Sequence, residues 1–404
     1  MWMNRREFLS VCGGLTATAL APAWTPAAQP PQDLKITRIV GFDLLSKRPK
    51  LVGKNSRLDV HGDQAGDRMV RLYTNTGLEG IGNCRAPEET LASLLGRNPF
   101  DFFKADERAM RSPLRAGSMP LWDLAGKALG KPVFELLGGQ GPRQVPVYDG
   151  SIYFADLLPQ YAARWQDRLK TEIDQGFQRG HRAFKIKIGR GAKWMPAAEG
   201  YARDKAVLKT IRQHTGPEVV LGVDANNGYG LSRTRQLLSE MPGLDLAWVE
   251  EMFPEVLEEN LELKAFLKER ELKTLIADGE TQSSLEPLKL FMAAHAIDIY
   301  QLDMNGQGLE GILAEAALAA KYDSMISPHN WGSLVGFYMA LHIGRAVPNF
   351  YRAEHDPLAN DVLIADGYDI KNGFVSVPES PGFGLKINEA RFAAAIKPRF
   401  DLKS

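Results

Sequence analysis

The runs VVLGVD at residues 219–224 and LAWVE at residues 246–250 decide the fold of this 404-residue chain. Each is a short apolar run that ends in a carboxylate. Segments with an amphipathic helical pattern separate such runs, which occur eight times from residue 145 onward. The other six runs occupy residues 145–149, 183–187, 275–280, 299–303, 324–329 and 350–354.

Strands that alternate with helices form a parallel sheet, and one strand–helix unit takes about 30 residues. The final residues of consecutive runs lie 23 to 38 positions apart. Eight such units predict an α/β fold, a closed (β/α)8-type barrel over residues 146–365. A doubly wound open sheet is the alternative, and it is disfavoured because no glycine-rich phosphate-binding motif follows the first run.

The segments on either side of the barrel have a different pattern. Residues 34–145 contain β-prone runs at 36–40 and 69–73 and a helical pattern at 121–129, so they predict an α+β capping domain. Residues 366–404 come too late to supply barrel strands. We expect this C-terminal segment to return to the capping domain.

The first residues have the pattern of a targeting signal. Arg5 and Arg6 precede Phe8 and Leu9, and a weakly apolar stretch and the small residues TPAA follow. This order predicts a twin-arginine-type signal peptide over residues 1–28. We therefore expect export, to the periplasm, by the twin-arginine export machinery.

Charge and hydropathy restrict the class of protein further. The chain has 49 basic and 49 acidic residues, which argues against a nucleic-acid binder because phosphate binding requires a basic excess. After residue 28, no apolar run approaches the roughly 18 residues that a membrane span requires. From these values we expect a soluble protein.

Three carboxylates end consecutive predicted strands: Asp224, Glu250 and Glu280. The C-terminal ends of barrel strands converge, so these side chains should meet. Three negative charges this close require a cation to remain ionised together. Oxygen ligands in this number favour one Mg²⁺ ion, rather than Zn²⁺, with water or substrate completing the coordination.

Acid–base candidates flank this predicted metal site. Lys185 and Lys187 share one face of a strand, and a metal and burial would lower their pKa values, so Lys187 is a candidate general base. Lys185 would stay charged and hold a substrate carboxylate. Asp303 would orient His329 as a second acid or base. Glu354, if protonated, would donate a hydrogen bond to an oxygen that becomes negative.

A divalent metal between two bases suits abstraction of the proton next to a carboxylate, because the metal stabilises the resulting enediolate. Together these residues resemble the enolase superfamily, within it the mandelate racemase/muconate lactonizing enzyme family and its mandelate racemase branch. The resemblance covers essentially the whole chain after the signal. Its motifs are WDLAGKALGKP at 122–132, LLGG at 136–139, KIK at 185–187, DAN at 224–226, WVEE at 248–251, GE at 279–280, Asp303 and His329.

The resemblance implies a role for each matching residue. It implies Asp224, Glu250 and Glu280 as Mg²⁺ ligands, and Lys187 and the His329–Asp303 pair as the bases. It also implies that Glu354 hydrogen-bonds the enolate, that Lys185 and Asn226 contact the substrate, and that the protein is a homo-oligomer. One departure is that Met252 and Phe253 stand before Pro254, where the family commonly has proline directly after the two glutamates.

The same site could support several reactions. We expect dehydration of an acid sugar (an aldonate, uronate or aldarate) to a 2-keto-3-deoxy product. A racemase or epimerase of a 2-hydroxy acid and an exported sugar-binding protein without turnover are the alternatives. The predicted loop at 44–62 is either a solvated charged segment or a cap that favours a hydroxylated anion. Its polar residues are Lys47, Arg48, Lys50, Lys54, Arg57 and His61.

Overall fold

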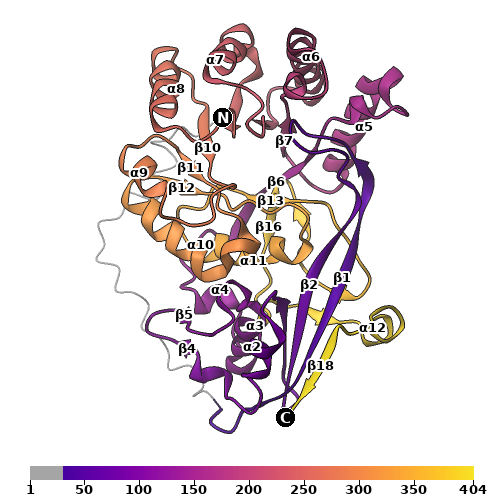
Figure 1. The fold of residues 1–404 in the computed structure, drawn as a ribbon, viewed down its shortest axis with the longest axis vertical. Helices are drawn as coiled ribbons and strands as arrows, with labels where there is room; N and C mark the ends of the chain where they lie inside the picture. The colour runs from indigo at the N-terminus through magenta and orange to yellow at the C-terminus, as the bar shows by residue number, and fades with distance from the viewer. Residues whose placement is uncertain (1–30) are drawn as a thin grey trace.

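The computed structural model describes residues 31–404, so the predicted signal peptide at residues 1–28 lies outside the described part of the chain. Figure 1 shows a strand–helix barrel joined to a smaller domain of strands and short helices. Of the helices in the described part, none combines the length and the apolar character needed to cross a membrane.

The barrel contains the eight predicted runs in chain order. Neighbouring strands pair in parallel from β6 through to β12, and β13 pairs in parallel with the other side of β6. A parallel bridge between Ile326 and Phe350 closes the ring. The predicted barrel is therefore confirmed. Its strands are β6 (Gln144–Ile152), β7 (Ala183–Lys187), β8 (Val220–Asp224), β9 (Leu246–Glu250), β10 (Leu275–Asp278), β11 (Ile299–Tyr300), β12 (Met325–Ile326) and β13 (Ala353–His355).

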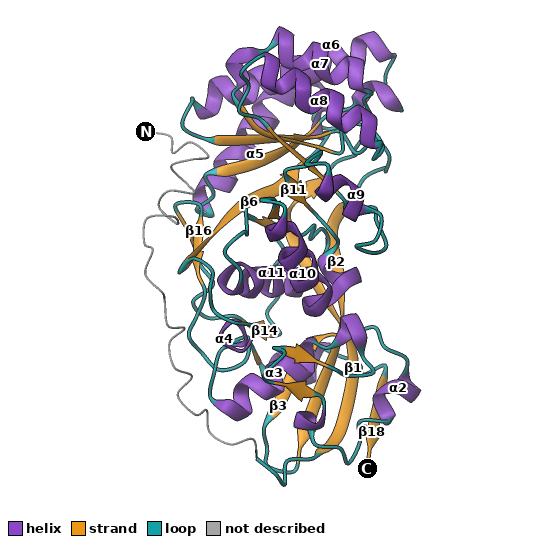
Figure 2. Cartoon of the chain, turned by 90° about the vertical axis from the view of Figure 1, so that its left-hand side faces the viewer, coloured by secondary structure: helices purple, strands orange, loops and turns teal. Residues whose placement is uncertain are grey.

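Helices cover the outside of this ring (Figures 1 and 2). The barrel helices are α5 (Trp165–Gln178), α6 (Ala197–Thr215), α7 (Leu231–Glu240), α8 (Leu257–Glu269), α9 (Leu288–Ala293), α10 (Met304–Lys321) and α11 (Leu334–Ala346). Every residue of α11 is buried, because this helix lies between the barrel and the smaller domain (Figure 2). The barrel interior is filled by large side chains, and Gly222 is small because the Trp248 indole lies directly against it.

The smaller domain is the predicted capping domain. Its antiparallel sheet has the order β18-β1-β2-β3, and α3 packs so closely on β3 that a Cβ at Gly80 would lie 2.1 Å from the Pro120 carbonyl oxygen. Its elements are β1 (Ile36–Val52), β2 (Gly62–Thr74), β3 (Glu79–Asn83), α2 (Glu88–Ala92), β4 (Phe103–Lys104), β5 (Ala109–Met110), α3 (Met119–Leu129), α4 (Val133–Leu136) and β18 (Phe400–Lys403).

The hairpin β1–β2 is much longer than the predicted runs at 36–40 and 69–73. It extends from the capping sheet to the barrel (Figure 1), where the backbone N–H of Lys47 donates to the Ala359 carbonyl at 2.8 Å. Side chains alternate between buried and exposed along β1 from Phe42 to Lys50. One face of β1 is therefore packed along this stretch.

The expectation that all of residues 366–404 return to the capping domain is wrong for its first part. The hairpin of β15 (Ile370–Lys371) and β16 (Phe374–Ser376) adds to β6 instead, with Val375 opposite Val145. The start of β6 extends beyond its barrel neighbours, and pairing with β16 covers this edge. The rest of the segment contains β17 (Lys386–Ile387), which pairs with β14 (Leu363–Ile364), then α12 (Glu389–Ala395) and β18.

Candidate active site

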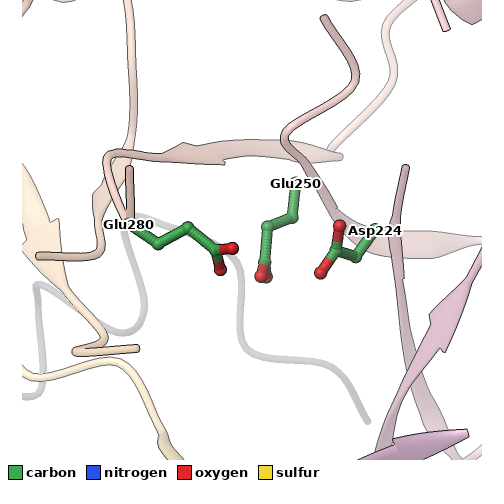
Figure 3. A group of neighbouring side chains, drawn as sticks. All are labelled: Asp224, Glu250 and Glu280. Atoms are coloured by element: carbon green, nitrogen blue, oxygen red, sulfur yellow. The ribbon is translucent and has the colours of Figure 1, made fainter. Parts of the chain in front are cut away.

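Three carboxylates converge at the C-terminal end of the barrel strands. Asp224 is the last residue of β8, Glu250 is the last residue of β9, and Glu280 follows the end of β10 by two residues. Their ligand atoms all lie within 4.8 Å of one another, with Glu250 between the other two (Figure 3). The structure therefore brings together the three predicted metal ligands.

Strand register explains this convergence. Lys187 is opposite Asp224 in the β7–β8 pair, and Asp224 is opposite Glu250 in the β8–β9 pair. Side chains at equivalent positions of neighbouring parallel strands lie side by side on one face. After β10 the chain turns through Gly279, whose φ of 121° a residue with a side chain rarely adopts, and this turn places Glu280 beside the other two.

The properties of this cluster fit a bound magnesium ion. Burial, helped by the charges of Asp224 and Glu354, raises the pKa of Glu250 against the opposing effect of Lys185. The Oε2 atom of Glu280 is buried and has no hydrogen-bond partner within residues 31–404. Oxygen ligands in this number match the preference of Mg²⁺, and a cation would compensate both features.

Lys185 and Lys187 are buried against these carboxylates. Lys185 contacts Glu250, and its Nζ lies 2.8 Å from the Glu354 Oε1 and 3.4 Å from the Asp224 Oδ2, while Lys187 contacts Asp224. Burial lowers the pKa of each amine, but the carboxylates outweigh burial and the pKa of each is raised. The lowering expected from the sequence applies to the metal-bound site and stays a prediction. It presupposes that Asp224 is neutralised by the metal ion.

His329 and Asp303 form the predicted pair at the opposite end of the cluster. The His329 Nδ1 lies 2.8 Å from the Asp303 Oδ2, and its Nε2 lies 3.6 Å from the Glu280 Oε2. Burial lowers the pKa of His329, but Glu280 and Asp303 raise it more, to about 9. Asp303 is itself held by the backbone N–H of Gly306, which donates to it at 2.6 Å. Asp303 thus orients the ring so that Nε2 faces the carboxylate cluster.

Glu354 does not have the protonation state that the sequence analysis assumed. Burial raises its pKa, but Lys185 and then His329 outweigh burial, so the pKa is lowered and the carboxyl is ionised. Its Oε2 accepts a hydrogen bond from the backbone N–H of Asn330 at 2.9 Å. In this arrangement Glu354 is an acceptor that holds Lys185, and the prediction of a protonated donor is corrected.

Asn226 follows the ligand Asp224 with a φ of 42°, and its backbone N–H donates to the Asp224 Oδ1 at 2.8 Å. Its side-chain N–H donates to Glu251 at 2.9 Å, while its Oδ1 is buried without a partner in the described chain. Burial and Glu280 raise the pKa of Glu251 to about 11. The sequence motif WVEE contains Glu251, but no role at the site was predicted for this residue. The departure at Met252 and Phe253 places two buried apolar residues there.

The predicted polar loop at residues 44–62 has cations that bind carboxylates of the protein, rather than cations that are all in solvent or facing the substrate. Three of them form ion pairs with carboxylates of the protein, so they are not free to hold a substrate anion. The pairs are Arg48–Asp356 at 2.6 Å, Lys50–Glu172 at 2.6 Å and Lys54–Asp59 at 3.0 Å. The first two pairs are almost completely buried and link β1 to the barrel.

An aromatic wall, formed by His61, Tyr153 and Trp331, stands beside Lys187. The rings of Tyr153 and Trp331 are stacked with centroids 4.7 Å apart, and His61 packs edge-on against Tyr153 at 4.7 Å. The Lys187 Nζ lies 5.1 Å from the centroid of Tyr153. Sequence reasoning missed Tyr153 and Trp331, because no pattern marks an aromatic residue that follows a strand as part of a site.

A half-open cavity of about 520 Å³ lies between the capping domain and the barrel, next to Asp303. Both domains therefore contribute to the surroundings of the catalytic candidates. Its lining includes Asn83, Arg85, Arg115, Asp303, Asn305 and Trp331.

Comparisons with known proteins agree with this geometry. The family model "Enolase C-terminal domain-like" matches residues 168–391. D-galactarolactone cycloisomerase from Agrobacterium fabrum is 27% identical over 81% of this chain and 90% of its own length. D-gluconate dehydratase from Thermoproteus tenax is 26% identical over 80% of this chain and 68% of its own length.

Solved structures give the same indication. Galacturonate dehydratase from Geobacillus sp., in a complex with D-galacturonate and 5-keto-4-deoxy-D-galacturonate, has a TM-score of 0.81 and 31% identity. That match covers 90% of this chain and 97% of the other. A variant of the dehydratase complexed with Mg has a TM-score of 0.84 and 29% identity, covering 93% of this chain and 99% of the other.

Proposed function

The chain belongs to the enolase superfamily, in its mandelate racemase/muconate lactonizing enzyme family, and from this premise we propose that it dehydrates an acid sugar with Mg²⁺. One observation carries the proposal: candidate proton-transfer groups stand at both ends of the carboxylate cluster. Lys187 contacts Asp224 at one end, and the His329 Nε2 faces Glu280 at the other. A substrate held at the cluster therefore has one such group on each side.

Mg²⁺ is the cofactor, and Asp224, Glu250 and Glu280 are the residues that would hold it. When bound, the ion withdraws charge from the substrate carboxylate and makes the neighbouring C–H acidic enough for a side chain to deprotonate. Lys185 is buried beside the cluster and pairs with Glu250 and Glu354, which keeps it charged and positioned to orient that carboxylate.

The two ends of the cluster take different parts in the elimination. Lys187 removes the proton from the carbon next to the carboxylate, and His329 gives a proton to the hydroxyl of the following carbon. The C–H and C–O bonds break, water leaves, and the enol converts to a ketone beside a deoxygenated carbon. Asp303 suits His329 to the acid role, because its carboxylate holds Nδ1–H and stabilises the protonated ring.

The specific substrate that we propose is a hexuronic acid, with D-galacturonate the first to assay. The support is the similarity to the Geobacillus galacturonate dehydratase, whose complex holds D-galacturonate and a keto-deoxy sugar acid. This uronate carries one carboxylate beside a C–H and a neighbouring hydroxyl. Those are the groups that the elimination requires.

The test is a proton NMR assay in deuterated water with Mg²⁺ and a panel of uronic, aldonic and aldaric acids. Loss of the signal at the carbon next to the carboxylate, together with a keto-deoxy product, supports dehydration. Exchange without that product would show racemisation or epimerisation instead. Binding of an acid sugar without any exchange would show a sugar-binding protein and would overturn the proposal.

We also propose that residues 1–28 direct export to the periplasm by the twin-arginine route and that the exported protein is a homo-oligomer. The support for export is Arg5-Arg6 ahead of the apolar stretch. Replacing both arginines by lysine should leave the protein in the cytoplasm in a cell-fractionation experiment. Light scattering of the purified protein should give a mass that is a multiple of that of one chain.

A further inference from the structure

His61, at the end of the loop that leads into β2, carries a donor that the rest of the described protein does not use. Its Nδ1 lies 3.1 Å from the Nε1 of Trp331. An indole nitrogen can only donate, so the Nδ1 of His61 must accept and carries no proton. Burial, with the nearby charges of Lys187 and Arg48, lowers the pKa of His61 to about 4, so the ring is neutral. The proton of the neutral ring is therefore on Nε2.

The Nε2–H group has no hydrogen-bond partner. It is buried from solvent, and no acceptor within residues 31–404 lies in range. A buried donor without a partner destabilises the folded protein, so most such groups in native structures serve a purpose.

The surroundings of His61 place this donor at the active site. Its ring packs on Tyr153, which contacts the candidate base Lys187. The loop before β2 is also attached to the metal-ligand region, because the Ser56 hydroxyl donates to the Ala225 carbonyl at 2.5 Å. The ring of His61 thus lies one side chain away from Lys187, and its charge-free donor is close enough for the Lys187 ammonium to influence it.

We propose that His61 is a substrate-binding residue that donates a hydrogen bond from Nε2 to a hydroxyl oxygen of the sugar acid. This inference rests on the proposed function. In the proposed function, Lys185 and the metal ion bind the substrate carboxylate. Other residues must therefore bind the hydroxyl groups. Arg48, Lys50 and Lys54 are held in ion pairs within the protein, whereas His61 offers a neutral donor that can bind a hydroxyl oxygen.

A pair of variants separates the two ring nitrogens. His61→Asn keeps an acceptor near the position of Nδ1 for Trp331 but removes the donor at Nε2. His61→Gln places an amide N–H near the position of Nε2. We expect His61→Asn to raise KM about tenfold with kcat nearly unchanged, since one hydrogen bond is lost from both the bound substrate and the transition state. His61→Gln should restore most of the affinity.

The affinity for deoxy sugars distinguishes substrate binding by His61 from a purely structural role, because a structural role would not change the relative affinities of these analogues. One monodeoxy analogue, the one lacking the partner hydroxyl, should bind wild type and His61→Asn equally well, measured by calorimetry with Mg²⁺ present. An equal loss for every analogue would overturn the proposal, and so would an unchanged KM in a variant that keeps the wild-type melting temperature. Absence of proton exchange with every acid sugar in the wild type would overturn the proposed function first.

Discussion

The carboxylate cluster of the barrel and the hairpin β1–β2 are both rich in charged residues, yet they use charge in opposite ways. At the barrel, Asp224, Glu250, Glu280 and Glu354 outnumber the two amines of Lys185 and Lys187, so negative charge is left over and the arrangement calls for a cation. Along the hairpin, Arg48 and Lys50 each meet a carboxylate of the protein and need nothing further. Charges left uncompensated within a fold indicate a binding site, whereas compensated charges indicate a structural attachment.

Replacement of a group at the cluster should produce the largest effect on activity. Lys187→Ala should lower kcat about 10²–10⁴-fold, because a base in contact with the reacting carbon is lost. Steady-state kinetics with the acid sugar that wild type turns over measure the effect. Lys209→Ala, on the exposed side of α6, is the matched control and should leave kcat unchanged. An active Lys187→Ala enzyme would show that the proton is taken elsewhere.

Replacement in the hairpin should affect stability rather than the chemical step. Arg48→Ala leaves Asp356 as a buried charge without its partner, which should lower the free energy of unfolding by about 3–5 kcal/mol in urea denaturation. Arg38 on the same strand pairs with Asp401 while 40% exposed, so Arg38→Ala should lower the free energy of unfolding by no more than about 1 kcal/mol. Equal losses in the two variants would contradict the distinction between the buried and the exposed pair.

Magnesium should affect the stability of the folded protein through the cluster alone. At an ion concentration about 100 times the dissociation constant, binding should stabilise the protein by about 2.7 kcal/mol and raise its melting temperature. Asp224→Asn should abolish this rise, and EDTA should reverse it in the wild type. Asp401→Asn at the capping sheet is the control and should keep the full response. A response that survives Asp224→Asn would place the ion elsewhere.

Two buried histidines outside the carboxylate cluster and the hairpin should make the free energy of unfolding depend on pH. Burial, with Arg345 nearby, lowers the pKa of His342 to about 3, and burial with His181 nearby lowers that of His355 to about 3. In the unfolded chain these histidines have their ordinary pKa of about 6.5. Stability is therefore full above pH 6.5 and falls as the pH drops from there toward 3, by up to about 1.4 kcal/mol per unit for each ring.

His342→Asn should reduce this slope in melting experiments between pH 7 and pH 5. The side chain of His342 accepts from the backbone N–H of Phe134 at 3.1 Å, and an asparagine oxygen can replace that contact. Mutation of His295, which lies on a surface turn, should leave the slope as it is. A wild-type protein with the same stability at both pH values would contradict the assignment of neutral buried rings.

The barrel and its metal site could be predicted from sequence because they depend on a short repeat. A run that ends in Asp224 and another that ends in Glu250 must place these residues at the same end of a parallel sheet. The wall of Tyr153 and Trp331 could not be predicted, because it depends on how loops from different strands pack. For the same reason the ion pair of Arg48 could not be predicted, because its partner Asp356 lies 308 positions away in the chain.

Protonation states were the other part that sequence alone could not give. Strand alternation placed Lys185 beside the cluster, but the prediction for Glu354 required the identity of its neighbours. Contact with Lys185 lowers the pKa of Glu354 and makes it an acceptor. Distances of a few ångströms between charged side chains decide these protonation equilibria. A sequence repeat of about 30 residues does not specify such distances.

The pairing of β18 with β1 has a consequence for the timing of synthesis. Phe400 and Lys403 lie opposite Gly41 and Arg38, so the capping sheet joins β1 to a strand that is translated much later. During translation β1 lacks this neighbour until residues 400–403 have been synthesised and have left the ribosome. The capping domain begins early in the sequence but is therefore completed late, and a stop codon placed before residue 399 should yield a protein whose hairpin exposes an uncovered edge to aggregation.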